Sequence, residues 1–527
     1  MTDNAEERNA FPGGDTQSIW QGTFPVPDYP ALDWDLTTDV CVVGAGIAGL
    51  TTAYMLAREG KQVAVLDDGP IGGGETGRTT AHLSDAMDDR IYVLERVHGE
   101  EGARRIVSSH GAAINRIEEI IRLEQIDCDF ARVSGYLFLA PGDSEDVLDR
   151  ELEAAHRAGL SDVHKLTRAP IADWGSGPCL EFPNQARFHA LRYLTGLAEA
   201  FVRQGGKIYC GSHVASIEGG APCKVQTKDG RTVTADAVCV CTNGSISDMV
   251  RTHTLQAPYR TFAVALAVPR GTVNDALYWD TGSSYHYVRL QPLDRADAGI
   301  TKGDTLYDAL IVGGEDHRTG NPDHAEERWE RLAAWARERW PQAGQAVFRW
   351  SGQCLEPNDY AAFIGPNPDG AQNVYMVSGD SGQGITHGTI AGILLNDMIA
   401  GRENPWATVY DPRRITLGVK PAEDFLMHNA DVAYRFVKDY LVKGDATSES
   451  DIARGEGRIV RRGTHKLAVY RDDEGALHEC SAACTHLKCI VAWNATEKTW
   501  DCPCHGSRFD PYGKVLNGPA VEDLPPA

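Results

Sequence analysis

Two short boxes near the C-terminus carry the residues with the clearest chemistry. The first reads Cys484-Thr485-His486-Leu487-Lys488-Cys489, and the second reads Cys502-Pro503-Cys504-His505-Gly506-Ser507. Each box offers thiols and an imidazole, which are ligands for zinc or for iron. A zinc site would need neither the extra cysteines nor the Gly506-Ser507 tail. The boxes therefore favour a [2Fe-2S] centre in which thiolates hold one iron and imidazoles hold the other.

This segment resembles the Rieske domain of the cytochrome bc and b6f complexes. Gly518-Pro519-Ala520 is similar to the loop that covers the cluster in that family. Phe509 departs from the pattern, because many relatives have a tyrosine there that donates a hydrogen bond to a ligand sulfur. Fewer such hydrogen bonds lower the potential, so we expect a value below that of the respiratory clusters. The resemblance implies thiolates from Cys484 and Cys502, imidazoles from His486 and His505, and a disulfide between Cys489 and Cys504.

A second motif near the N-terminus depends on the strands and the helix that position it. Residues 39–43 form a short apolar run, typical of a parallel strand buried on both faces. Gly44, Gly46 and Gly49 follow, then a helical stretch over 50–59 and a second strand that ends at Asp67. This is the dinucleotide fingerprint, with the pyrophosphate at the helix N-terminus and Asp67 on the ribose. The fingerprint alone does not separate FAD from NAD.

Two further glycine-rich segments extend this predicted cofactor site. Residues 72–82 read GGGETGRTTAH, and residues 378–388 read SGDSGQGITHG before an apolar helix. Together with the fingerprint they resemble the D-amino-acid oxidase family of FAD enzymes, which includes glycine oxidase, sarcosine oxidase and dimethylglycine dehydrogenase. The resemblance covers roughly residues 38–415 and implies FAD as the cofactor. Its further cofactor-binding residues would be Arg78, Thr79, His82, Asn243, Gly379, Gly382, Gly384 and Thr386.

Three roles are open for His82. In some of these dehydrogenases a histidine at a similar place is bonded covalently to the flavin. The alternatives for His82 are a polar contact with the flavin and a purely structural role. The second glycine segment has a clearer purpose, since a helix N-terminus there would stabilise the negative charge that develops on a reduced flavin.

The resemblances imply an α/β FAD-binding Rossmann-like domain with an interleaved α+β substrate domain, followed by a small all-β Rieske domain. An N-terminal arm would span residues 1–35, the oxidoreductase region 36–415, a helix and linker 416–450, and the Rieske domain 451–527. FAD-binding segments are expected at about 36–85, 185–255 and 350–415, and substrate-domain segments at about 86–184 and 256–349. Apolar periodicity predicts long helices over 100–124, 326–340 and 425–442.

The expected substrate domain supplies the candidate catalytic residues. Tyr285, Tyr287 and Arg289 alternate along one predicted strand and so share a face. Arg260 or Arg289 would hold a substrate carboxylate as a bidentate fork, and Tyr285, Tyr287 or His317 would orient the amine. The alternative for each is an ordinary sheet or interface residue. His317 and His324 do not complete a two-His, one-carboxylate iron site, and this argues against the hypothesis that the protein is a Rieske oxygenase.

Composition limits the partners. The chain has 527 residues, 42% hydrophobic and 24% charged, as in a soluble protein of several domains. Its net charge of −23 makes nucleic acid an improbable partner. No apolar run reaches the length of a membrane span, and the first thirty residues hold no signal-peptide core, so we expect a cytoplasmic protein without a membrane partner. Most of the 13 cysteines are scattered and are expected to be free thiols.

These observations predict an FAD-dependent dehydrogenase for an amine or amino-acid substrate. The substrate would give a hydride to the flavin, and electrons would pass to the Rieske cluster and then to an external acceptor. In one alternative a donor protein reduces the cluster and the flavin uses the electrons for reduction or oxygen chemistry. In another the chain is a redox module without an organic substrate.

Overall fold

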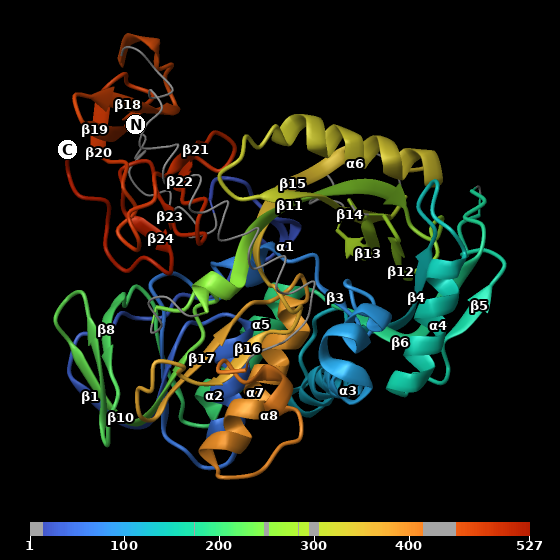
Figure 1. The fold of residues 1–527 in the computed structure, drawn as a ribbon, viewed down its shortest axis with the longest axis horizontal. Helices are drawn as coiled ribbons and strands as arrows, with labels where there is room; N and C mark the ends of the chain where they lie inside the picture. The colour runs from blue at the N-terminus through green and yellow to red at the C-terminus, as the bar shows by residue number, and fades with distance from the viewer. Residues whose placement is uncertain (1–13, 173, 247–251, 283, 295–304, 415–448) are drawn as a thin grey trace.

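The structure is a computed structural model, and it describes residues 14–172, 174–246, 252–282, 284–294, 305–414 and 449–527. The strands of these residues form two large sheets and two small ones (Figure 1). The first residues of the predicted arm and the helix predicted over 425–442 lie outside the described residues.

The first large sheet carries the glycine fingerprint. Its strands are β1 (Leu36–Val43), β2 (Val63–Leu66), β7 (Lys207–Tyr209), β10 (Thr232–Val240), β16 (Phe363–Pro366) and β17 (Val374–Ser378), with a hairpin of β8 (Val214–Glu218) and β9 (Cys223–Thr227). They lie in the order β16-β17-β10-β1-β2-β7, and all but β16 pair in parallel. The helices α2 (Ile47–Arg58), α5 (Ala190–Arg203) and α7 (Gly384–Ile399) pack beside it, with α2 against both others. This confirms the predicted Rossmann-like domain.

The second large sheet forms the roof over the first. Its strands are β3 (His82–Leu83), β4 (Ala131–Phe138), β5 (His164–Leu166), β6 (Cys179–Arg187), β11 (Gln256–Pro269), β12 (Leu277–Asp280), β13 (Tyr287–Leu293), β14 (Tyr307–Arg318) and β15 (Ala346–Pro357). In β11, Phe262 and Val264 pack with the helix α6 (Ala325–Arg339), while Ala263 belongs to the core on the opposite face. Period-two alternation therefore leaves small side chains on the inner face.

Two boundaries differ from the sequence prediction. Residues 350–357 were expected in an FAD-binding segment, but they lie in β15 and pair with β11 of the roof. Residues 185–187 also belong to the roof, in β6.

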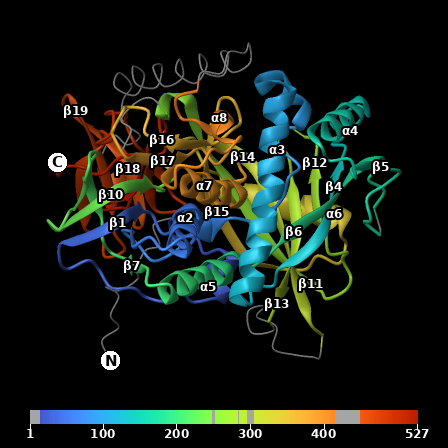
Figure 2. The same ribbon diagram turned by 90° about the horizontal axis from the view of Figure 1, so that it is seen from below.

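The helix expected from residue 100 begins earlier, since α3 spans Ile91–Glu124 with a kink at Gly99, where φ is +73°. This helix contacts both α4 (Asp146–Ala158) and α7 and so connects the two sheets (Figure 2).

The C-terminal domain is built from two small antiparallel sheets. The first holds β18 (Glu456–Arg462), β19 (His465–Arg471) and β20 (Leu477–Ser481), and the second holds β21 (Ala492–Asn494), β22 (Thr499–Asp501), β23 (Arg508–Phe509) and β24 (Val515–Asn517). Its core contains Trp500 and Phe509 together with the box cysteines. The domain lies against the first sheet and the near ends of β11 and β15 (Figure 1).

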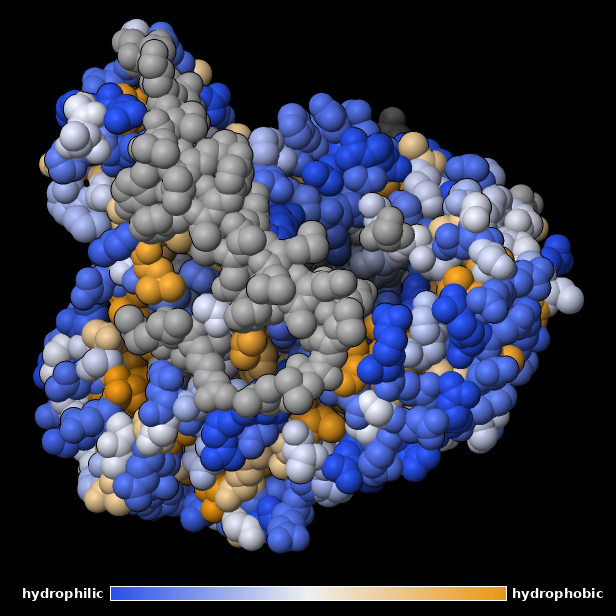
Figure 3. Space-filling model, in the orientation of Figure 1, coloured by the Kyte–Doolittle hydropathy of each residue, from blue (hydrophilic) through white to orange (hydrophobic). Residues whose placement is uncertain are grey.

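The remaining surface agrees with the composition. Hydrophilic side chains cover most of the face shown in Figure 3. Of the N-terminal arm, the described part docks on the body through the short helix α1 (Ile19–Thr23), whose Trp20 is fully buried. No helix in the described ranges combines the length and the hydropathy of a membrane span.

Candidate functional site

A cavity of about 320 Å³ runs between the two large sheets and is closed on one side by the C-terminal domain. The glycine turn after β1 lines one end, and the inner face of the roof lines the other. Residues 515–518, 520 and 521 of the C-terminal domain complete the wall. Parallel sheets place their ligand at the carboxyl ends of the strands, where this cavity lies.

The fingerprint glycines have the steric roles that their spacing predicts. Gly44 has a φ of +108°, and a Cβ there would stand 2.4 Å from the carbonyl oxygen of Cys241. A Cβ on Gly49 would lie 1.8 Å from the carbonyl oxygen of Gly44, so α2 approaches the turn only with glycine at this position. Gly46 lines the cavity at the start of α2, where the positive end of the helix suits a pyrophosphate. This end is therefore a cradle for a dinucleotide.

Asp67 lies where the fingerprint predicts it, at the end of β2 on the cavity wall. Its Oδ2 accepts from the backbone N–H of Ala45 at 2.6 Å, and its Oδ1 accepts from that of Gly69 at 2.8 Å. Burial raises the pKa of this carboxyl to about 7. Asp67 is therefore held in place by the glycine turn and is available to a ribose hydroxyl.

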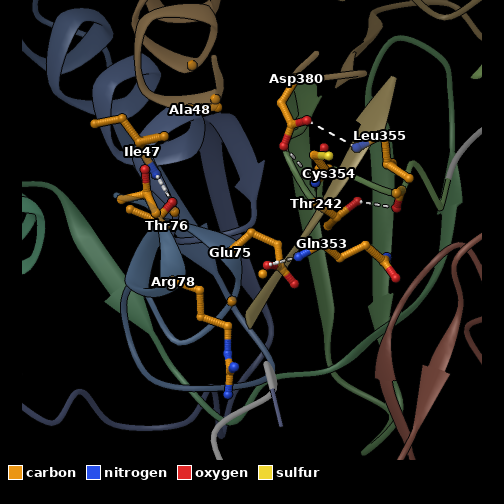
Figure 4. A pocket seen from close by; sticks show the side chains of 18 of the residues that line it. Ile47, Ala48, Glu75, Thr76, Arg78, Thr242, Gln353, Cys354, Leu355 and Asp380 are labelled. Carbon is orange, nitrogen blue, oxygen red and sulfur yellow. Dashed lines mark hydrogen bonds between the residues drawn. The ribbon is translucent and has the colours of Figure 1, made fainter. Parts of the chain in front are cut away.

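The second glycine segment places a helix N-terminus on the same cavity. Gly379 and Gly382 have φ values of +74° and +73°, which only glycine adopts easily. Gly384 and Thr386 start α7 and line the cavity, so the positive end of that helix faces a bound flavin. Asn243 also lines the cavity and donates to Asp380 Oδ2 at 3.4 Å. Asp380 Oδ1 accepts from the N–H of Leu355 (Figure 4).

The loop over residues 72–82 forms the floor of the cavity. Thr76 Oγ1 accepts from the N–H of Ile47 at 3.1 Å, and Glu75 Oε2 accepts from that of Gln353 at 2.7 Å (Figure 4). Thr79 lines the cavity, as predicted. The stem of Arg78 also lines it, but its guanidinium points away, toward the C-terminal domain and the arm. Arg78 therefore joins domains and does not donate to a cofactor.

His82 lies in the cavity wall below the roof. Its Nδ1 is 3.1 Å from Thr80 Oγ1, and its ring stands edge-on to Tyr287 at 5.5 Å. Burial lowers the pKa of His82 to about 3, so the imidazole is neutral. Its position fits a contact with the flavin end of a cofactor.

The roof brings Tyr285 and Tyr287 together, with ring centroids 5.4 Å apart, and both line the cavity. Two carboxylates that the sequence reasoning missed lie beside them. Tyr285 Oη donates to Asp88 Oδ2 at 3.4 Å, and Tyr287 Oη is 2.7 Å from Thr261 Oγ1, which hydrogen-bonds to Asp316. Burial raises the pKa of each carboxyl to about 6. Successive side chains of a strand point to opposite faces of the sheet, so Asp316 shares a face with Gly314 and points into the cavity when its neighbour His317 points away. This alternation is the sequence signal that could have identified Asp316.

Three predicted catalytic residues lie elsewhere, and we correct those assignments. The Arg260 guanidinium pairs with Asp501 of the C-terminal domain at 3.3 Å. Arg289 donates from Nη1 to the carbonyl oxygens of Ala81 and Phe188, at 2.8 and 2.9 Å. His317 lies outside the cavity, 2.9 Å from Asp323. Arg260 and Arg289 already have buried partners, and His317 lies outside the cavity wall, so none of the three is placed to hold a substrate.

The two boxes lie together at the tip of the C-terminal domain. The thiols of Cys484 and Cys502 are within hydrogen-bond range of each other, and the rings of His486 and His505 have centroids 5.1 Å apart. Two thiols and two imidazoles brought together in this way are the ligand types of a Rieske-type [2Fe-2S] cluster. Cys489 and Cys504 form the predicted disulfide, so their sulfurs are not ligands. The four remaining side chains fit the predicted ligand set.

The residues around the two boxes affect the reduction potential of the cluster. Ser507 Oγ hydrogen-bonds to the Cys484 sulfur and accepts from the N–H of Ala520 at 3.0 Å. Phe509 is fully buried and has no hydroxyl to add a further hydrogen bond. His253, from the short helix η2 (His253–Leu255), packs against both ligand rings, at 5.1 Å from His486 and 6.2 Å from His505. The ligand edge is therefore covered by the body of the chain.

The wall between the cavity and the boxes is thin. Gln353 lines the cavity, and its Nε2 donates to the carbonyl oxygen of Gly506 at 2.9 Å. Gly506 is the residue after His505. Below this contact, Glu497 is fully buried between Arg78 at 3.1 Å and Arg260 at 3.7 Å. The junction thus joins a cofactor cavity to a metal centre through one side chain and is held by buried opposite charges.

Comparison with known proteins agrees with both halves of this arrangement. Residues 39–398 match the family model described as FAD dependent oxidoreductase, and residues 444–526 match that of the Rieske [2Fe-2S] domain. The chain belongs to the FAD dependent oxidoreductase family. It is an oxidoreductase of the amino acid and amine oxidase type with a Rieske domain, and its cofactors are FAD and a [2Fe-2S] cluster, as predicted.

Individual relatives resemble this oxidoreductase over different lengths. A Rieske 2Fe-2S iron-sulfur protein of Bacillus subtilis (strain 168), YhfW, is 32% identical over 96% of this chain and 97% of its own length. Gamma-glutamylputrescine oxidoreductase of Escherichia coli (strain K12) is 29% identical over 71% of this chain and 86% of its own. The crystal structure of glycine oxidase from Geobacillus kaustophilus has a TM-score of 0.57 at 18% identity, over 72% of this chain and 100% of that one, and shows the shared fold.

Proposed function

We propose that this oxidoreductase is an amine or amino-acid dehydrogenase whose flavin electrons leave through the Rieske cluster to an external acceptor. The observation that carries the proposal is Gln353, which lines the cofactor cavity and hydrogen-bonds to Gly506 beside His505. A cluster joined to the cavity by one side chain is a short route for single electrons. FAD bound in the cavity would accept a hydride from the substrate and release its two electrons one at a time.

The residues of the chain would divide the work by position. The glycine turn and the start of α2 hold the pyrophosphate, with Asp67 on the ribose. The N-terminus of α7 supplies positive potential at the other end of the cofactor. The inner face of the roof, with Tyr285 and Tyr287, then bounds the space left for a substrate.

The proposed reaction removes a hydride from the carbon next to nitrogen and a proton from the nitrogen. The product is an imine, which water hydrolyses to a carbonyl compound and an amine or ammonia. The proton needs an acceptor at the roof, and the Asp88 and Asp316 carboxylates lie there. The name of the relative gamma-glutamylputrescine oxidoreductase supports a nitrogen-bearing substrate for this chain.

The test follows both cofactors at once under anaerobic conditions. The holoenzyme is mixed with panels of amines and amino acids while flavin absorbance and the EPR signal of the reduced cluster are recorded. We expect flavin bleaching followed by cluster reduction. If no panel member bleaches the flavin, yet a chemical one-electron donor reduces first the cluster and then the flavin, electrons enter through the Rieske domain and the proposal is wrong.

A variant tests the route itself. Gln353→Leu removes the hydrogen bond to Gly506 and should slow cluster reduction while flavin bleaching keeps its rate. Gln372→Leu is a matched control, because Gln372 is exposed and lies outside the cavity wall. Equal cluster-reduction rates in both variants would show that Gln353 is not on the route.

A further inference from the structure

The flavin end of the cavity is acidic and aromatic. Asp88 and Asp316 line it together with Tyr285, Tyr287 and Trp279. We infer that the substrate is a protonated amine that carries no carboxylate on the carbon to be oxidised. This inference rests on the proposed function and narrows its substrate class.

The first support is the balance of charge. Six carboxyl side chains line the cavity, those of Asp67, Asp68, Glu75, Asp88, Asp316 and Asp380. Among the described residues, Arg78 is the only lining residue that carries a permanent positive charge. The Arg78 guanidinium is committed to Glu497 and to backbone carbonyls outside the cavity. Among the described residues no free cation faces this negative space, so a substrate carboxylate would enter it at a cost in free energy.

The cations nearest to the two carboxylates are also engaged. Arg90 donates to the carbonyl oxygens of Asp88 and Asp280, at 3.0 and 2.9 Å. Arg328 donates to those of Glu315 and Asp323, both at 2.7 Å. Neither arginine lines the cavity. Within the described part of the chain, the two carboxylates therefore face the cavity without a protein cation in front of them.

The second support is an incomplete hydrogen-bond set. Asp316 Oδ1 is buried and has no hydrogen-bond partner in the structure. A buried carboxylate oxygen without a donor is costly, and a positively charged N–H group supplies both the donor and the charge. An anionic or purely apolar ligand would leave this oxygen without a donor, whereas an ammonium N–H group satisfies it and gains the charge attraction.

The third support is the set of rings. Tyr285 and Tyr287 lie 5.4 Å apart and Trp279 belongs to the same wall. Aromatic faces attract cations through their quadrupole, and the carbon chain of an amine gains from burial against them. Carboxylates beside aromatic rings form an arrangement suited to an ammonium group.

The binding experiment uses two non-reacting probes of opposite charge on the FAD-loaded, cluster-containing protein. tert-Butylammonium keeps its N–H donors but has no hydrogen on the carbon next to nitrogen, so it cannot give a hydride, and pivalate carries a carboxylate on the same tert-butyl group. Calorimetric titration should show binding of tert-butylammonium and none of pivalate. Asp316→Asn should weaken the binding of the cation about 10- to 100-fold. Asp308→Asn is the matched control, because Asp308 lies on the same strand, outside the cavity, and pairs with Arg270.

The turnover experiment compares each amine with the amino acid from which decarboxylation would produce it. The pairs are butylamine and norvaline, benzylamine and phenylglycine, and putrescine and ornithine. We expect the amine of a pair to bleach the flavin at least tenfold faster. If Asp316→Asn loads too little FAD to be measured, Asp88→Asn takes its place in the titration.

The outcomes distinguish a failure of the inference about the substrate from a failure of the proposed dehydrogenase function. Binding of pivalate as tight as that of the cation, or faster bleaching by an amino acid than by its amine, overturns the inference and leaves the dehydrogenase proposal standing. An unchanged affinity for the cation in Asp316→Asn, or in Asp88→Asn where that variant takes its place, also overturns the inference. If no member of any pair bleaches a flavin that dithionite still reduces, the proposed function fails and the inference fails with it.

Discussion

Replacing Glu497 by glutamine removes one negative charge from the junction and keeps the shape of the side chain. Glu497 and Arg78 are both fully buried and 3.1 Å apart, and Arg260 lies 3.7 Å away. Leaving a buried charge without its partner costs about 3–5 kcal/mol. Arg260 keeps Asp501 at 3.3 Å, so we take the lower figure, about 3 kcal/mol. At about 1.36 kcal/mol per factor of ten, the open, undocked population should rise by about 100-fold.

Two backbone amides report this opening directly. The N–H of Asp15 donates to the Glu497 carbonyl oxygen, and that of Thr16 donates to Oε2, both at 3.0 Å. Amide hydrogen exchange in the Glu497→Gln variant should therefore accelerate by about 100-fold at these residues, since such exchange follows the free energy of local opening. Flavin content should stay unchanged.

The matched control is another ion pair across the same two domains. Lys228 and Asp523 lie 2.6 Å apart, but their side chains are 49% and 40% exposed. Exposed pairs contribute about 1 kcal/mol at most, so Lys228→Ala should accelerate the exchange by less than about fivefold. If Glu497→Gln gave no more acceleration than this control, the buried charges would not be what holds the domains together.

Three further predictions concern the cofactors and the pH. Ser507→Ala removes a hydrogen bond to the Cys484 sulfur and should lower the cluster potential by tens of millivolts in a redox titration; an equal or higher potential would contradict its role. Gly49→Ala places a Cβ 1.8 Å from the Gly44 carbonyl oxygen and should abolish FAD retention, measured as flavin per protein, whereas Gly175→Ala in open space should not. Burial raises the pKa of Asp88 and Asp316 to about 6, so affinity for tert-butylammonium should be full above pH 7 and be lost as the pH falls through 6, where the carboxyls take up protons. Titration calorimetry showing a constant affinity between pH 5 and 8 would exclude both carboxylates as its partners.

The features that the sequence predicts well are local or periodic. Gly44, Gly46 and Gly49 act within one turn and one helix start, so their spacing reveals their role. The cysteine and histidine boxes are equally compact, and the fold follows from resemblance to families that share these motifs. Even the disulfide joins two positions only 15 residues apart.

The failures involve partners far apart in the chain. Arg260 meets Asp501 across 241 positions, and Arg289 meets Ala81 across 208. No periodic pattern identifies such a partner. The sequence therefore predicts that an arginine on a strand near the active site binds substrate, although its guanidinium is bound to a distant part of the chain. The role of Asp88 and Asp316 is hidden for a related reason. Each has an acidic neighbour in the sequence, and such a pair in a loop or near a strand end resembles any surface segment until the roof is folded over the cavity.

The loop at residues 515–521 has a consequence for how the holoprotein is made. It belongs to the last domain of the chain, yet it forms part of the wall around the cofactor, and its Gly518 lies against Gly244 of the first sheet. A large dinucleotide enters such a space most easily while that wall is still open. Biogenesis should therefore have an order, with FAD loaded before the iron-sulfur domain docks, and the docked domain should then act as a kinetic barrier to cofactor loss.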